Sequence, residues 1–198
     1  MKKRVGVLAL QGDFEAHQRA LERAGAEAVQ VRTAEALADL DGLVIPGGES
    51  TTMLKLLDYM HLKEPLRKFA EEKPVFGTCA GAILLAKDVQ NPTQESFGAV
   101  DLTVERNAYG RQLDSRVASI HPNADFEQRT GAGDVEAVFI RAPIIRRTGP
   151  GVRVLAQYEG DPVLVEQGRH LVATFHPELT QDSRVHQLFL TKIQDTRA

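Results

Sequence analysis

One short block constrains the fold of this chain more than any other: a lone cysteine between glycines, directly after an apolar run. The block is Gly77-Thr78-Cys79-Ala80-Gly81, and Pro74-Val75-Phe76 precedes it. Gly-x-nucleophile-x-Gly is the spacing of the sharp turn that carries a nucleophile between a strand and a helix. Such a turn has no room for Cβ atoms at the two glycine positions. The block therefore predicts a strand, a tight turn and a helix, in that order.

The reactivity of Cys79 is a separate question from its place in the fold. A lone cysteine taken by itself is more often an inert buried thiol. A thiol becomes a strong nucleophile only where a neighbouring group stabilises its thiolate. The chain has no second cysteine, which excludes an internal disulfide and is typical of a reducing cytoplasm. The other residues must decide whether Cys79 reacts.

Length and composition bound the class of protein. The 198 residues, 42% hydrophobic and 26% charged, suit one globular α/β domain over residues 1–198. A net charge of −3 gives no electrostatic case for nucleic acid or an anionic membrane, and the apolar runs are too short to span a membrane. The six histidines are scattered, with none at a zinc-ligand spacing from Cys79, so no metal is predicted.

The first half of the chain alternates apolar strands with amphipathic helices. Strands are expected at residues 5–10, 28–31, 43–45 and 74–76, and helices after Asp13, after a cap at Ser50 or Thr51, at 65–71 and at 80–86. This rhythm predicts a mostly parallel central sheet with helices on both faces.

The second half has a different pattern. Alternating strands are expected at residues 100–104, 137–140, 152–158, 163–166 and 170–175, with turn signals between them, and a last helix at 182–194. We expect antiparallel strands appended to the parallel core. The polar, glycine-bearing residues 121–134 are expected to form a surface loop.

His176-Pro177-Glu178 is the second block with chemical potential. In an extended segment Glu178 would lie on the same side as His176, fix its tautomer, and leave the other ring nitrogen for a nucleophile. An isolated block of this kind is more often an ordinary loop. However, functional groups gather beyond the carboxyl ends of strands in α/β sheets, and Cys79 and His176 are each expected at such an end.

The third block is Pro46-Gly47-Gly48-Glu49-Ser50, between an expected strand and helix. Its glycines leave backbone N–H groups open to a ligand, and with the amide of Ala80 they would form an oxyanion hole. The block lacks the Gly-Lys-Ser/Thr ending of a phosphate loop. A tight turn with a capping serine is an equally open interpretation.

These blocks together resemble the class I glutamine amidotransferases, and among them the glutaminase subunits of pyridoxal 5′-phosphate synthase. The resemblance runs from residue 10 to residue 180. The blocks that carry it are Leu10-Gln11-Gly12, Pro46-Gly47-Gly48-Glu49-Ser50-Thr51-Thr52, Phe76-Gly77-Thr78-Cys79-Ala80-Gly81, Val104-Glu105-Arg106-Asn107, Tyr109-Gly110-Arg111-Gln112, Phe139-Ile140-Arg141-Ala142-Pro143 and Phe175-His176-Pro177-Glu178-Leu179-Thr180.

The resemblance implies a three-layer flavodoxin-like fold and a catalytic triad of Cys79, His176 and Glu178. It implies an oxyanion hole at Gly48 and Ala80, and it implies that L-glutamine is held by Gly47, Gly48, Glu49, Arg106, Ile140 and Arg141. The chemistry of the residues is compatible, because arginine matches a carboxylate and Glu49 can face an ammonium. By themselves, Arg106 and Arg141 would read as solvated surface charges.

The resemblance also implies an activity and a partner. Glutamine is hydrolysed to glutamate and ammonia through a γ-glutamyl thioester. The ammonia passes to a (β/α)₈-barrel synthase subunit in a cytoplasmic hetero-oligomer, which combines it with a pentose phosphate and a triose phosphate. Pyridoxal 5′-phosphate is then a product, and no cofactor is expected.

Three other interpretations stay open at this point. The chain could be an amidotransferase subunit serving imidazole glycerol phosphate synthesis, or a cysteine peptidase or stress protein on the same fold. It could also be a scaffold with a vestigial site, although the complete set of Cys79, His176 and Glu178 argues against that.

Overall fold

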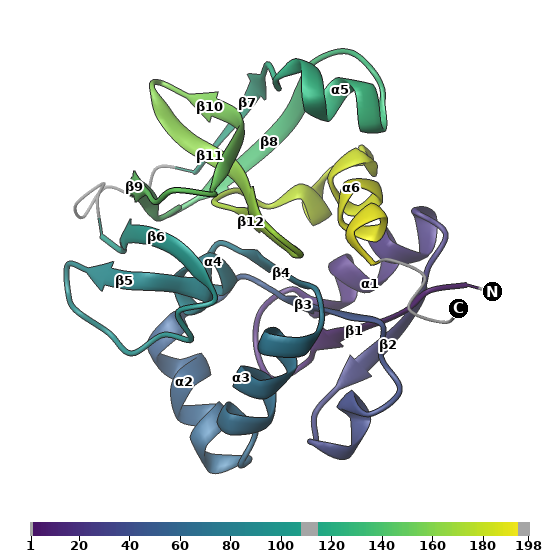
Figure 1. The fold of residues 1–198 in the computed structure, drawn as a ribbon, viewed down its shortest axis with the longest axis vertical. Coiled ribbons are helices and arrows are strands. Elements are labelled where there is room, and N and C mark those ends of the chain that lie inside the picture. Colours follow the sequence, from purple (N-terminus) through teal and green to yellow (C-terminus); the bar gives the residue numbers. More distant parts are fainter. Residues whose placement is uncertain (1, 108–114, 194–198) are drawn as a thin grey trace.

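A computed structural model describes residues 2–107 and 115–193 of the chain. The block Tyr109-Gly110-Arg111-Gln112 lies outside the described residues. Figure 1 shows a central sheet with helices on both faces and smaller groups of strands beside it. Of the helices in the described ranges, none is long and apolar enough to cross a bilayer.

The elements follow the order that the apolar pattern predicts in the first half. The strands are β1 (Arg4–Leu8), β2 (Glu27–Val31), β3 (Gly42–Ile45), β4 (Val75–Thr78), β5 (Ala86–Gln90), β6 (Val100–Glu105), β7 (Ser115–Ile120), β8 (Val135–Ile140), β9 (Ile144–Thr148), β10 (Arg153–Tyr158), β11 (Asp161–Gln167) and β12 (His170–Ala173). The helices are α1 (Phe14–Arg23), α2 (Ser50–Tyr59), α3 (Lys63–Glu72), α4 (Ala80–Leu85), α5 (Ala124–Thr130) and α6 (Arg184–Lys192), with 3-10 turns η1 (Glu35–Leu37) and η2 (Pro177–Leu179).

Within the described residues, the largest sheet has seven strands in the order β10-β11-β12-β4-β3-β1-β2. The strands from β12 to β2 pair in parallel, whereas β11 pairs antiparallel with both β10 and β12. The prediction of a mostly parallel sheet with appended antiparallel strands is confirmed. Residues 170–175, grouped in the sequence with the antiparallel additions, supply β12, which belongs to the parallel part of the sheet.

The inner strands β1, β3 and β4 are buried on both faces of the sheet, so they read as continuous apolar runs rather than alternating ones. In β3, Leu43 and Ile45 pack into a core that includes residues of α2, α3 and α4. Val44 points the other way, into a second core with residues of α1, α5 and α6. Two helical layers therefore enclose one sheet.

One helix and three strands differ from expectation. Residues 121–134 were predicted to form a loop, but they contain α5, which Asn123 caps by accepting a hydrogen bond from the Phe126 N–H at 3.0 Å. The Phe126 side chain is fully buried. The strands β5, β7 and β9 were not predicted at all, and they pair with β6 or β8 outside the central sheet. Their polar and charged residues weaken the alternation that marks a strand.

Phe189 on α6 tests how much the second core contributes to stability. It is fully buried, and its ring lies 5.6 Å from that of Phe76 on β4. Phe189→Ala should lower the free energy of unfolding by about 3–5 kcal/mol, because it removes a large apolar side chain and leaves a cavity. Urea denaturation measures the change. Tyr59→Ala is the control, since Tyr59 is 79% exposed, and a similar loss for both variants would contradict the packing.

Candidate active site

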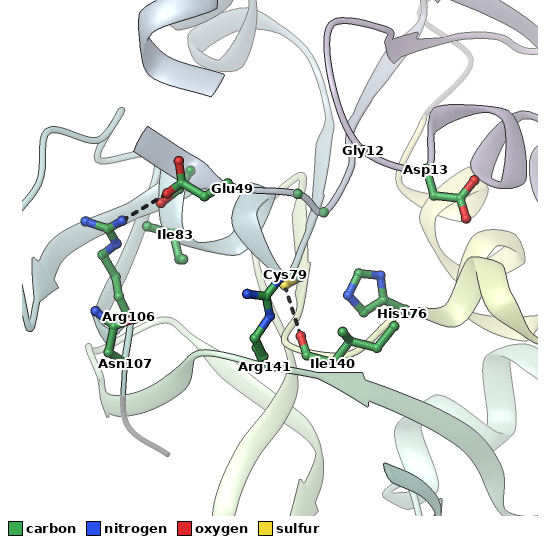
Figure 2. Close-up of a pocket in the computed structure, with 13 residues that line it drawn as sticks. Gly12, Asp13, Glu49, Cys79, Ile83, Arg106, Asn107, Ile140, Arg141 and His176 are labelled. Atoms are coloured by element: carbon green, nitrogen blue, oxygen red, sulfur yellow. Dashed lines mark hydrogen bonds and ion pairs between the residues drawn. The ribbon is translucent and has the colours of Figure 1, made fainter. Parts of the chain in front are cut away.

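The sheet order brings three loops to one edge. β12, β4 and β3 are neighbours and run parallel, so the residues after them meet beyond their carboxyl ends. Cys79 follows β4, the segment to His176 follows β12, and Gly47-Gly48 follows β3. These residues line one cavity of about 310 Å³ (Figure 2).

Cys79 sits in a strained turn between β4 and α4. Its φ is 50° and its ψ is −105°, a region that side-chain-bearing residues rarely adopt. A Cβ on Gly77 would lie 2.5 Å from the carbonyl oxygen of Gly81, and a Cβ on Gly81 would lie 2.1 Å from the carbonyl oxygen of Ile45. Both glycines are therefore required for the turn to pack against β3, as the sequence predicts.

His176 and Glu178 are joined by a 3-10 turn, not by the extended segment that we expected. η2 begins at Pro177, and the turn returns the carboxylate to the ring, with Glu178 Oε1 2.7 Å from His176 Nδ1. The backbone N–H of His176 donates to the Val138 carbonyl at 2.8 Å. That bond ties the segment to β8, whose end carries Ile140 and Arg141 to the cavity.

The electrostatics of this group favour a charged imidazole. Burial by itself would lower the pKa of His176, but its hydrogen bonds and charge interactions with Cys79 and Glu178 outweigh burial and raise that pKa well above its ordinary value. Burial likewise opposes ionisation of Glu178, yet its pKa is lowered by the nearby His17 and by the bond to His176. The His176 ring therefore interacts with both the Cys79 sulfur and the Glu178 carboxylate.

The glycine loop is pressed against the same group. A Cβ on Gly47 would lie 2.5 Å from Cε1 of His176 and 3.3 Å from Cβ of Cys79, and Gly48 has a φ of 140°. On the other side, a Cβ on Gly12 would meet the Gly47 carbonyl oxygen at 1.8 Å, and Gln11 Oε1 accepts from the Glu49 N–H at 3.2 Å. Gln11, to which we assigned no separate role, thus holds the loop in place.

Ala80, the second expected oxyanion donor, is the first residue of α4 and adjoins Cys79. It is buried and does not line the cavity with its side chain. The first amides of a helix have no partner within the helix, so the backbone there is suited to an anionic ligand. The Cys79 N–H, in contrast, donates to the Ala173 carbonyl at 3.0 Å.

Glu49 and Arg106 lie at the opposite end of the cavity and contact each other (Figure 2). Glu49, rather than Ser50 or Thr51, caps α2. Its carboxylate accepts from the N–H groups of Thr51 at 3.0 Å and Thr52 at 2.7 Å. The Thr52 hydroxyl also donates to Glu49 Oε2, at 2.7 Å, and this bond together with the two backbone bonds outweighs burial and lowers the pKa of Glu49 to about 2. Arg106 donates to Thr51 Oγ1 at 2.8 Å and lies 3.4 Å from Glu49 Oε1.

Ile140 and Arg141 close the cavity from the side of β8 (Figure 2). The Cys79 thiol points to the Ile140 carbonyl oxygen, at a long 4.0 Å. Arg141 has a φ of 44°, so its backbone adopts a left-handed turn directly after the strand. The cavity therefore has a thiol at one end, and arginines and a carboxylate around the rest, which suits a zwitterionic amino acid.

A family model described as the SNO glutamine amidotransferase family matches residues 7–195. The chain belongs to this family. It is therefore a glutamine-hydrolysing enzyme of the α/β amidotransferase type, and the resemblance found in the sequence is confirmed.

Named relatives and solved structures agree with this assignment. The chain is 68% identical to "Pyridoxal 5'-phosphate synthase subunit PdxT" of Solibacter usitatus, over 96% of this chain and 100% of the relative. It is 56% identical to the protein of that name from Koribacter versatilis, over 97% and 96%. A solved structure titled "Crystal structure of glutamine amidotransferase" is 48% identical, with a TM-score of 0.85 over 96% of this chain and 98% of that one.

A more distant solved structure shares the fold alone. It belongs to PurLQS from Thermotoga maritima and is 17% identical, with a TM-score of 0.70 over 98% of this chain and 100% of that one.

Gly47→Ala tests the contact between the glycine loop and the histidine. The added methyl would force His176 or the loop to move, and a displacement of about 1 Å at reacting groups costs about 100-fold in rate. We expect at least that loss in glutaminase kcat, measured by ammonia release. Gly98→Ala is the control for backbone strain outside the cavity, because Gly98 has a φ of 67° but its added methyl meets no atom within 4 Å. Equal activities of the two variants would contradict this geometry.

Glu178→Gln tests the charge beside His176. The neutral amide no longer stabilises the imidazolium, so the pKa of His176 falls and the ring loses its proton at a lower pH. If His176 acts as the acid, the alkaline limb of the kcat/KM profile must move to lower pH, with kcat reduced on the order of 10²–10⁴-fold. A pH–rate profile measures both, and an unmoved alkaline limb would contradict the assignment.

Proposed function

We propose that this chain is the glutaminase subunit of a pyridoxal 5′-phosphate synthase, and that Cys79, His176 and Glu178 form its catalytic triad. One observation carries the proposal: a strained cysteine, a histidine and a buried carboxylate lie in series at one end of a cavity lined by Glu49 and Arg106. The name that the relatives share supports the identity of the assembly and favours it over one serving imidazole glycerol phosphate synthesis.

The substrate is L-glutamine. Its α-carboxylate pairs with Arg106 and Arg141, and its α-ammonium faces Glu49. The backbone of Gly47, Gly48 and Ile140 holds the chain of the substrate, so that the side-chain amide lies over Cys79. For this, Arg106 exchanges part of its contact with Glu49 for the carboxylate of glutamine. The low pKa of Glu49 keeps it anionic, as an ammonium ligand requires.

The chemistry begins with transfer of the Cys79 proton to His176. The thiolate attacks the side-chain carbonyl carbon, and the developing oxyanion accepts hydrogen bonds from the N–H groups of Gly48 and Ala80. His176 then donates its proton to the amide nitrogen, the C–N bond breaks, and ammonia leaves a γ-glutamyl thioester. Water attacks the thioester, His176 takes its proton, and glutamate departs as the thiolate is restored.

Ammonia is useful only if it reaches an acceptor. We place this chain in a cytoplasmic hetero-oligomer with a (β/α)₈-barrel synthase subunit, which joins the ammonia to a pentose phosphate and a triose phosphate. The glycine loop is the element through which docking can control hydrolysis, because Gln11 and Gly12 press on it from one side and His176 from the other. The whole of residues 1–198 acts as one glutaminase domain.

Cys79→Ala tests the proposal directly. Ammonia release from L-glutamine should fall at least about 10⁴-fold, because no other residue replaces the sulfur. The wild type should be faster with the synthase subunit than without it. His176→Asn should lose most of the turnover as well. Undiminished activity of Cys79→Ala would overturn the triad, and a wild-type rate unaffected by the synthase subunit would overturn the proposed control by docking.

A further inference from the structure

A buried polar cluster lies directly behind the proposed triad and takes no part in the mechanism above. His17 on α1, Thr78 at the end of β4 and His186 on α6 are each fully or almost fully inaccessible to solvent. None of the three lines the cavity. Histidines are usually partly exposed, and two adjacent buried ones need a physical reason.

The cluster contacts the far oxygen of Glu178. Oε1 of Glu178 faces His176 Nδ1, whereas Oε2 lies 3.3 Å from Nε2 of His17. Oε2 has no hydrogen-bond partner of ordinary geometry among the described residues. The same Nε2 is 3.0 Å from Thr78 Oγ1. One ring nitrogen therefore faces both the carboxylate and the residue that precedes Cys79.

These contacts determine where the protons lie. A carboxylate only accepts hydrogen bonds, and a bare Nε2 lone pair 3.3 Å from it in a buried site would be repelled, so His17 carries its proton on Nε2. Nδ1 of His17 is then an acceptor, and His186 Nε2, 3.0 Å away, must donate to it. The remaining nitrogen, His186 Nδ1, then carries no proton to donate. This agrees with its having no hydrogen-bond partner within the described chain.

Both rings are neutral in this arrangement. Burial lowers the pKa of His17 and, more strongly, that of His186, and in His17 burial outweighs the opposing charge of Glu178. The rings are also fixed by packing, since each lies edge-on to Phe76, at centroid distances of 6.2 Å and 5.7 Å. Neither ring can turn without displacing a core aromatic.

We propose that His17 is a positioning residue for the triad, and that His186 fixes the tautomer in which it serves. The Nε2–H of His17 orients the Glu178 carboxylate so that Oε1 is directed at His176. The same N–H group contacts Thr78, and so connects the carboxylate to the turn that holds Cys79. This inference rests on the proposed function of the triad.

His17→Met and His17→Gln separate positioning from packing. Methionine fills the space without a donor, whereas glutamine retains an N–H group in place of Nε2. His17→Met should lower glutaminase kcat about 10- to 100-fold, which is the usual cost of losing the partner that orients an active-site ligand. KM should stay unchanged, because His17 does not line the cavity. His17→Gln should recover most of kcat. His61→Gln, at an exposed histidine, is the control.

A second measurement does not depend on activity or on the variants folding. Correlation of ring ¹⁵N and ¹H signals in the wild-type protein at neutral pH reports the tautomer of each histidine. We expect neutral rings protonated at Nε2 for both His17 and His186. A charged His17, or one protonated at Nδ1, would overturn the inference whatever the rates.

The outcomes also separate this inference from the proposed function. Wild-type kcat in a folded His17→Met, or equal losses in His17→Met and His17→Gln, would overturn the positioning role. A wild-type protein that releases no ammonia even with the synthase subunit, yet shows the expected tautomers, would overturn the proposed function and leave the placement of the His17 proton intact.

Discussion

The site depends on a steric constraint: the turns that follow three adjacent parallel strands pack so closely that a Cβ does not fit at Gly47, Gly77 or Gly81. Gly81 packs on the carbonyl of Ile45, and Gly47 packs on the ring of His176. The positive φ of Cys79 is the consequence, because the chain must turn sharply between β4 and α4 while β4 stays paired with β3. The strain is offset by burial of the six residues of α4, all in the core.

The first half of the chain and the position of the site could be predicted because their signals are local. Continuous apolar runs ended by glycine or proline mark buried parallel strands, and they locate β1, β3 and β4 with the residues that follow them. That Cys79 and His176 come together follows from strand order, which the rule of functional groups at carboxyl ends anticipates. The rule does not predict the 3-10 turn that brings Glu178 against His176.

What could not be predicted depends on contacts between distant segments. The cap of α2 was expected at Ser50 or Thr51, but the Glu49 carboxylate takes that place, since a side-chain acceptor one residue before a helix satisfies two unpaired N–H groups. α5 escaped notice because only Phe126 of its short polar sequence is buried. His17 had a signal that went unused: it shares the buried face of α1 with Ala16, Ala20 and Leu21, and a histidine at such a position needs a partner.

Two buried carboxylates, Glu166 and Glu178, are stabilised in different ways, and the contrast explains which residues surround Glu178 in the proposed triad. Glu166, 1% exposed, is surrounded by cations: Arg129 at 2.9 Å, Lys192 at 2.6 Å, and Arg153. These cations neutralise the charge of Glu166 directly, as a buried ion pair requires. Glu178, 4% exposed, faces only imidazoles in the described chain.

A cation in place of His17 would also face Oε2, but it would compete for the charge of Glu178 and lower the pKa of His176. A neutral N–H group avoids this, because it orients the carboxylate without adding a net charge that competes with His176 for Glu178. Burial keeps His17 neutral, and His186 keeps its proton on the nitrogen that faces Glu178. Burial of the cluster is therefore necessary for its proposed role. Near the surface the same two histidines would bind protons more readily, and a charged His17 would compete with His176 for the Glu178 carboxylate.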